Sequence, residues 1–276
     1  MKANQKMIRL SYIPTLFVLL CSAVGAQTLD RMVTDIEVPL QDPYCDGSYD
    51  AITIDAGNPL SCPSVQVTAV PADVVDWVLL ELRSTASDDD ASEAIDVVAR
   101  KPAFLLSNGR VVDASRYAEQ IMQDPTLLCA AAELEAQATC PDVEFIELEE
   151  ADDEDIYLVV RHRNHLDVIS ATNISGVADT NRNADIYSHD FSAGGSAFGT
   201  STLKEKDSDI HVLYGGDVDG DGEVNITDYT IGAASSIGIS AYHDGDTNFS
   251  SIVTPADYSD IIANNLTQSS QVPQIP

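Results

Sequence analysis

The sequence predicts a mainly β protein, an antiparallel β-sandwich followed by a small α-helical module. Three observations support this prediction. Short apolar runs rich in β-branched residues recur from residue 27 to about 209, with little helical periodicity between them. After residue 210 the pattern changes to loop, helix, loop, helix. The 276 residues, 44% of them apolar, suffice for one large domain or two small ones with a hydrophobic core.

The run from 74 to 83 is apolar on both faces, which is typical of a central strand. Its alternating side chains form two sets, Val75, Trp77 and Leu79 on one face and Val78, Leu80 and Leu82 on the other. Trp77 is therefore expected to be buried rather than to stack on a sugar. Further strands are expected at 65–69, 143–148, 156–163 and 166–169. Strands that follow one another without helices favour an antiparallel sandwich of two sheets.

A hairpin is expected where Asn108-Gly109 separates the apolar runs 103–106 and 110–112. Asn-Gly tolerates the positive φ angles of a type I′ turn, which matches the twist of the two flanking strands.

The chain is strongly acidic. It has 45 Asp and Glu against 14 Lys and Arg, so its formal net charge is −31. Such a charge repels nucleic acid and anionic membrane surfaces, and it excludes both as expected partners. It favours cationic partners, a divalent metal, or a salt-rich environment.

Residues 1–26 are typical of a secretory signal peptide. Lys2, Lys6 and Arg9 form a positive start, Leu16 to Val24 is a short apolar run, and Val24-Gly25-Ala26 offers a small-residue cleavage site. The apolar run is shorter than the roughly 20 residues that span a bilayer, and no later stretch reaches that length. We therefore expect an exported chain without a transmembrane segment after cleavage, located in the periplasm, on the cell surface or in the medium.

Four cysteines remain after cleavage, namely Cys45, Cys62, Cys129 and Cys140. In an exported chain an even number indicates disulfides, and four cysteines allow three pairings. The simplest pairing joins sequence neighbours, Cys45 with Cys62 and Cys129 with Cys140. Residues 127–139, rich in Ala, Leu and Glu, are expected to form a short helix in an insertion closed by the second pair.

Residues 217–228 match the calcium-loop pattern D-x-[DN]-x-[DN]-G-x5-E, with Asp in the last place. Calcium takes six to eight oxygen ligands, and alternating Asp residues on a tight loop aim carboxylates at one centre. Gly222 permits the sharp turn. The expected ligands are Asp217, Asp219, Asp221, the backbone carbonyl of Glu223, Asn225 and Asp228.

A second copy of this loop follows 29 residues later. Its expected ligands are Asp246, Asn248, Ser250, the carbonyl of Ile252, Thr254 and Asp257. Ser250 replaces a carboxylate and Ser251 replaces the turn glycine, so both calcium binding and a metal-free structural relic stay open. Short helices are expected after the loops, at 229–237 and 258–266.

The two loops, each followed by a helix, resemble the dockerin type I module with its repeat G-D-V-[ND]-G-D-G-x-V-N-x-x-D. Residues 216–228 match this pattern closely and residues 245–257 match it loosely. The resemblance implies a small calcium-folded module, which in some secreted enzymes binds a cohesin partner.

Residues 75–83 and 158–166 resemble segments of large secreted bacterial surface proteins, some of them labelled haemagglutinin-like. Those proteins often carry a dockerin-like segment near the C-terminus, and the closing Ser270-Gln271-Val272-Pro273 is similar. This resemblance implies the architecture and the export, but no reaction.

The only basic cluster is Arg161-His162-Arg163-Asn164-His165. It is open to interpretation as an anion or sugar-acid site, or as a metal site formed by His162 and His165. We expect instead that it pairs internally with carboxylates, which are abundant. The sequence contains neither a G-x-S-x-G nucleophile elbow nor an H-E-x-x-H zinc helix, so no catalytic residue is assigned.

The sequence thus predicts an exported calcium-binding surface or adhesion protein. The β-sandwich, residues 27–209, is the expected recognition domain. The dockerin-like module, residues 210–270, is expected to serve calcium-dependent folding or docking to a cohesin-like protein, and the partner of the sandwich is expected to be a surface glycan. Residues 271–276 form a tail within a polar end, from Thr267, that is expected to be loose. The alternatives are a carbohydrate-binding or enzymatic component of extracellular polysaccharide degradation assembled through a dockerin, and a salt-adapted structural domain.

Overall fold

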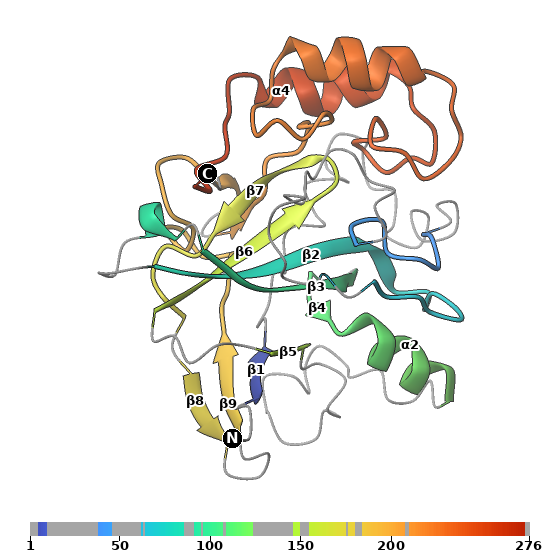
Figure 1. Cartoon of the computed structure of the whole chain (residues 1–276). Coiled ribbons are helices and arrows are strands. Elements are labelled where there is room, and N and C mark those ends of the chain that lie inside the picture. The colour runs from blue at the N-terminus through green and yellow to red at the C-terminus, as the bar shows by residue number, and fades with distance from the viewer. Residues whose placement is uncertain are drawn as a thin grey trace.

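The structure is a computed structural model that describes residues 5–9, 38–45, 62, 64–85, 91–94, 96–106, 109–123, 146–149, 155–174, 176–179, 184–207 and 210–273. It is mainly β, as predicted, and its largest sheet is antiparallel with the strand order β4-β3-β2-β6-β7 (Figure 1). The strands of this five-stranded sheet are β2 (Val74–Ser84), β3 (Asp96–Leu106), β4 (Val111–Val112), β6 (Ile156–His162) and β7 (His165–Ile169).

Strand β2 is the central strand of this sheet and every one of its residues is buried. Val78, Leu80 and Leu82 pack into one core, whereas Trp77 and Leu79 pack into another. Trp77 is 0% exposed, which confirms its predicted burial, and its indole nitrogen donates to the carbonyl of Pro39. Both faces of β2 carry apolar side chains because each face of the sheet packs against a hydrophobic core.

The predicted hairpin is confirmed between β3 and β4, where Phe104 pairs with Val112 and Leu105 with Val111. Gly109 adopts a φ of +83°, the left-handed conformation that glycine tolerates best.

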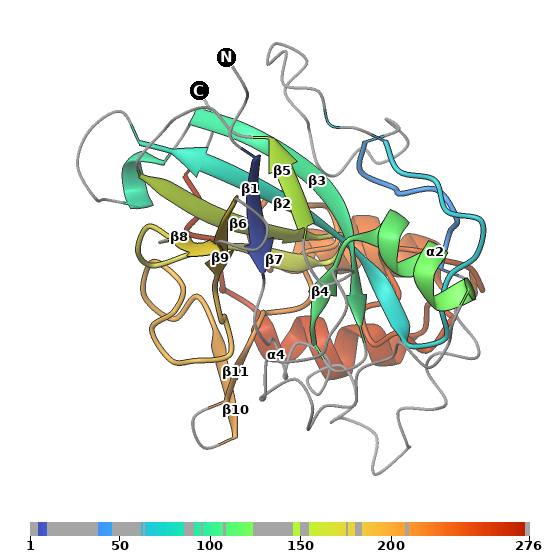
Figure 2. The same cartoon turned by 90° about the horizontal axis from the view of Figure 1, so that it is seen from below.

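A second, four-stranded sheet has the order β5-β1-β9-β8 and contains one parallel pair, β1 with β9. Its strands are β1 (Gln5–Arg9), β5 (Ile146–Glu149), β8 (Gly176–Asp179) and β9 (Ala184–Ser188). Figures 1 and 2 place this sheet and the C-terminal helices on opposite faces of the five-stranded sheet. Strand β1 is formed by residues that the sequence analysis assigns to a signal peptide, and the parallel pair was not predicted.

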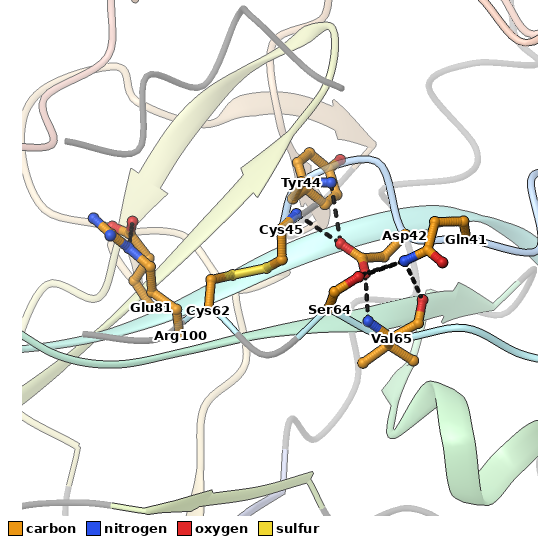
Figure 3. The surroundings of a disulfide bond; sticks show 9 residues. All are labelled: Gln41, Asp42, Tyr44, Cys45, Cys62, Ser64, Val65, Glu81 and Arg100. Carbon is orange, nitrogen blue, oxygen red and sulfur yellow. Dashed lines mark hydrogen bonds and ion pairs between the residues drawn. A yellow bond between two sulfur atoms is a disulfide. The ribbon is translucent and has the colours of Figure 1, made fainter. Parts of the chain in front are cut away.

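The predicted pairing of Cys45 with Cys62 is present, with their Cα atoms 5.3 Å apart (Figure 3). Beside it, the carboxylate of Asp42 accepts hydrogen bonds from five groups: the backbone N–H groups of Tyr44, Cys45 and Val65, the hydroxyl of Ser64 and the side-chain amide of Gln41. The expected strand 65–69 is only an extended segment, joined to the chain before it by the bridge between Gln41 and Gln66. Cys129, Cys140 and the expected helix 127–139 lie outside the described residues.

Helix α2 (Ala114–Gln123) was not predicted. Asp113 begins it as an N-cap, because its carboxylate accepts the backbone N–H of Arg116. Ala114, Tyr117 and Ala118 pack on the core that contains Trp77.

None of the helices in the part of the chain that the structure describes has the length and apolar character needed to span a membrane.

The C-terminal part contains two loop–helix units, so the two short predicted helices are confirmed. Their helical segments are η5 (Asp228–Ala233) and η6 (Ala234–Ser236) after the first loop, and η7 (Asp257–Ile262) and α4 (Ala263–Asn265) after the second. The short elements η2 (Ala91–Glu93), β10 (Lys204–Asp207) and β11 (Ile210–Val212) complete the fold.

The expectation of a loose end from Thr267 is wrong for residues 267–273. Val272 is buried against Tyr157, Val159 and Ile169 of the five-stranded sheet. The carbonyl of Pro273 accepts a hydrogen bond of 2.6 Å from Arg83. The segment is ordered because one apolar side chain and one carbonyl find partners on the sheet.

A buried ionic network crosses the five-stranded sheet and is centred on Glu81. Its carboxylate lies 2.9 Å from Arg83, 2.8 Å from Arg100 and 3.2 Å from Arg161. Burial acts to raise the pKa of Glu81, but the attraction of the three guanidinium groups outweighs it and lowers this pKa to about 2. Arg161 also pairs with Asp167. The predicted internal pairing of the basic cluster is therefore confirmed for Arg161.

We predict that Glu81→Gln destabilises the protein by about 3–5 kcal/mol, because it leaves three guanidinium groups, two of them fully buried, without their shared carboxylate. Urea unfolding followed by the fluorescence of Trp77 measures this change. Glu205→Gln, at an exposed position of strand β10, is the control and is expected to stay within about 0.5 kcal/mol of the parent protein. Equal unfolding midpoints for the two variants would contradict the prediction.

Candidate metal centre

The first predicted loop is anchored on one side by the five-stranded sheet and on the other side by the C-terminal segment. Before the loop, the N–H of Leu166 donates to the carbonyl of Tyr214, and the N–H of Gly216 donates to the carbonyl of Asn164, each at 2.8 Å. Within the loop, the N–H of Val224 donates to Gln268 at 2.8 Å, so the C-terminal segment holds the other side. These contacts fix the backbone independently of any ligand.

A small core lies beneath the loop. Val224 is 0% exposed and packs with Val218 of the same loop. The other members of this core are Leu166 of β7, Val253 of the second loop and Ile262 of η7. Val224 and Val253 occupy equivalent positions of the 29-residue repeat, and their side chains pack in one core shared by the two loops.

The loop brings Asp217, Asp219 and Asp221 together, with one carboxylate oxygen of each within 4.8 Å of the others. These three residues can hold a metal ion, and they are the one group of three or more metal-ligating side chains in the part of the chain that the structure describes. The turn depends on Gly222, whose φ of +86° favours glycine.

Hydrogen bonds inside the loop engage some carboxylate oxygens of the three Asp residues and leave one buried oxygen without a donor. Asp219 and Asp221 accept the N–H groups two residues further along, at 3.3 and 2.9 Å. Asp217 Oδ2 accepts the N–H of Gly222 at 3.2 Å. Asp217 Oδ1 is buried and has no hydrogen-bond donor among the described residues. A buried carboxylate oxygen without a partner is costly, and a bound cation removes that cost.

The electrostatics of Asp217 favour the same interpretation. Burial, together with the negative charges of Asp167, Asp228, Asp221 and Asp219, raises its pKa to about 8. Burial and the neighbouring Asp221 also raise the pKa of Asp219. Without a cation these carboxylates repel one another, and Asp217 takes up a proton instead.

The other three predicted ligands of this loop lie outside the three-carboxylate group. Asp228 is fully buried, and its two oxygens accept backbone N–H groups from Val218 and Asn225 at 2.6 and 2.7 Å. The side-chain oxygen of Asn225 accepts the N–H of Thr227 at 2.7 Å. Glu223 is exposed and its backbone pairs with Ser269. In the structure these residues close the loop.

The second loop repeats much of this hydrogen-bond pattern but differs at its first residue, Asp246. Both oxygens of Asp246 accept backbone N–H groups, from Ser250 and Ser251 at 2.8 Å each. Asp257 accepts the N–H groups of Asn248 and Thr254. The carbonyl of Ile252 accepts the hydroxyl of Ser250 at 3.0 Å. These oxygens are engaged within the loop.

Sequence reasoning missed Asp167. It lies on β7, pairs with Arg161 and contributes its charge to the environment of Asp217. The backbone carbonyl of Asp167 accepts the hydroxyl of Ser270, and the N–H of Ser270 donates to Gly222 of the loop. No sequence signal links residues 167 and 217, because the sheet alone brings them close.

Comparison with known proteins gave no match: no family model, no curated protein and no solved structure matches the chain. The resemblances to dockerins and to haemagglutinin-like surface proteins therefore depend on the residues quoted above.

We predict that the contribution of Asp217 to the stability of the metal-free protein falls as the pH rises from about 4 to about 8. The raised pKa of Asp217 means that the folded state holds a proton there which the unfolded chain has already released. Urea unfolding in the presence of a chelator measures this decline.

Asp217→Asn is the control for this prediction because it has no proton to lose. Asp167 and Asp246, whose pKa values burial raises to about 6, act in the same direction at lower pH. A comparison between about pH 6.5 and pH 8.5 therefore isolates Asp217. Parallel stability curves for the parent protein and the variant over that range would contradict the prediction.

Proposed function

We propose that the chain is an exported calcium-binding protein whose C-terminal module binds Ca²⁺ in its first loop. The observation that carries this proposal is the buried oxygen of Asp217, which lacks a donor and lies beside the carboxylates of Asp219 and Asp221. The sequence of the loop adds the calcium pattern, with a turn glycine and a closing Asp228. Calcium is favoured over magnesium because the loop offers many oxygens, whereas magnesium requires a small, strict octahedron.

Asp228, Asn225 and the carbonyl of Glu223 complete the ligand set in this proposal. Asp228 already orders the loop backbone through its N–H acceptors, so the ion enters a loop whose shape is largely set. Ca²⁺ neutralises the acidic cluster, and binding is thereby coupled to the stability of the folded state.

The wider role that we propose is that of a surface or adhesion protein. The two sheets form a β-sandwich that serves as the recognition domain, and the module is dockerin-like. The contacts of the module with β7 and with the C-terminal segment favour a role in calcium-dependent folding over a role as a mobile plug for a cohesin-like partner. A surface glycan is the proposed ligand of the sandwich, and binding of the intact protein to a glycan array tests this; a blank array in saturating calcium would argue against it.

We predict that calcium raises the melting temperature by about 5–10 °C when its concentration is about 100 times the dissociation constant, because only the folded chain offers the site. Calorimetry with calcium and with chelator measures this shift. The double variant Asp217→Ala and Asp219→Ala should lose it. Asp260→Asn, in helix η7 outside both loops, is the matched control and should keep it. An unchanged melting profile of the parent protein would refute the calcium proposal.

We predict that the exported protein begins at Gln27, because the small residues before it suit signal cleavage. Expression with export, followed by N-terminal sequencing, provides the measurement. Cleavage there removes β1 from the sheet that it forms with β5 and β9. A mature protein that retains residues 5–9 would contradict the signal-peptide assignment.

A further inference from the structure

The second loop keeps the backbone conformation of the first loop but replaces both of its positive-φ glycines. Gly220 and Gly222 have φ values of +70° and +86°, and the residues 29 positions later, Phe249 and Ser251, have φ values of +57° and +70°. A bulky residue in this left-handed region is strained. Such strain persists only where the surrounding structure enforces it, and it often marks a position with a function.

The surroundings of Phe249 supply the reason for this strain. Its side chain is 1% exposed, although the equivalent Gly220 is exposed. Its ring centroid lies 5.7 Å from that of His162 and 6.2 Å from that of His165, at the turn between β6 and β7. The guanidinium carbon of Arg163 lies 4.9 Å from the same ring centroid, within the range of a cation–π contact. Phe249 is thus inserted against the five-stranded sheet.

Arg163 and Asn164, the turn residues, bind the segment that leads into the second loop. Arg163 Nη1 donates to the carbonyl of His243 and lies 4.0 Å from a carboxylate oxygen of Asp244. Asn164 Nδ2 donates to the carbonyls of Asp244 and Asp246 at 3.0 and 3.1 Å. The turn therefore meets residues 243–246 with two side chains that donate hydrogen bonds, one of them positively charged.

Arg163 is itself held firmly in this position. Its Nε donates to Asp76 Oδ2 at 2.9 Å, and Asp76 also accepts the hydroxyl of Tyr242. The guanidinium carbon lies 4.4 Å from the ring centroid of Tyr242. The positive charge is therefore fixed between the sheet and the start of the second loop, and the predicted internal pairing of the basic cluster extends to Arg163.

We propose that the second loop is an intramolecular docking element and not a metal site. Phe249 and residues 242–246 bind the β6–β7 turn, Arg163 supplies positive charge where a second ion would otherwise be needed, and the chain holds one metal ion, in its first loop. Both oxygens of Asp246 accept backbone N–H groups within the loop, whereas the equivalent Asp217 of the first loop has one buried oxygen without a donor, in agreement with this assignment. The inference rests on the proposed function, since it requires the first loop to bind an ion.

The number of calcium ions per chain tests the proposal directly. Calorimetric titration of the full chain with Ca²⁺ is expected to give one ion, lost in Asp217→Asn and retained in Asp246→Asn with a dissociation constant changed by less than about threefold. Two ions per chain, or loss of the single ion in Asp246→Asn, would overturn the docking proposal. A parent protein that binds no ion would instead refute the calcium proposal for the first loop.

Phe249→Gly tests the contact between the second loop and the β6–β7 turn, because it gives the second loop the glycine that the first loop has at the equivalent position. With calcium at saturation, the unfolding midpoint reported by Trp77, the only tryptophan, is expected to fall by about 5–10 °C. Ile252→Ala, an exposed apolar residue of the same loop, is the control and should shift the midpoint by less than about 2 °C. Equal midpoints for the two variants would overturn the proposal. If Phe249→Gly does not fold, the count of ions on the parent chain still decides.

Discussion

The structure depends on one constraint: in a chain with a net charge of −31, each buried carboxylate must meet positive charge or enough hydrogen-bond donors. Asp76 meets Arg163, and Glu81 meets three arginines. Asp217 is the exception, since none of the cationic side chains that the structure describes pairs with it and one of its oxygens has no donor. Its environment raises its pKa to about 8, and the same environment is what gives a divalent cation a favourable place.

The hairpin of β6 and β7 organises both halves of the C-terminal module. The first loop is anchored through the backbone of Asn164 and Leu166, and the second loop through the side chains of Arg163 and Asn164. The ionic network around Glu81 reaches the same hairpin through Arg161 and Asp167. Two repeats of one sequence pattern therefore contact one hairpin in different ways, one suited to a metal ion and the other to a direct contact.

Local patterns could predict those elements whose physics is local. The run around Trp77, apolar on both faces, predicts a covered strand, and Asn108-Gly109 predicts a turn. The first loop could be predicted equally well, because its alternating Asp residues lie close together in the chain around Gly222 and meet by loop geometry alone. Helix α2 was not predicted, although Asp113 at its start is a typical N-cap residue. The short strands β8 and β9 lie in a polar segment without a long enough alternation to indicate pairing.

The sequence by itself determined the mainly β class, the acidic loop and its repeat, because residue spacing along the chain sets each of them. Only the tertiary structure decided that residues 267–273 pack on the sheet, that Asp167 lies near Asp217, and that Phe249 inserts beside Arg163. These contacts join residues 50 or more positions apart, and nothing in the local pattern specifies which distant surface a side chain will meet. The position of the second loop in particular depends on the β6–β7 turn, which lies 80 residues before it in the chain.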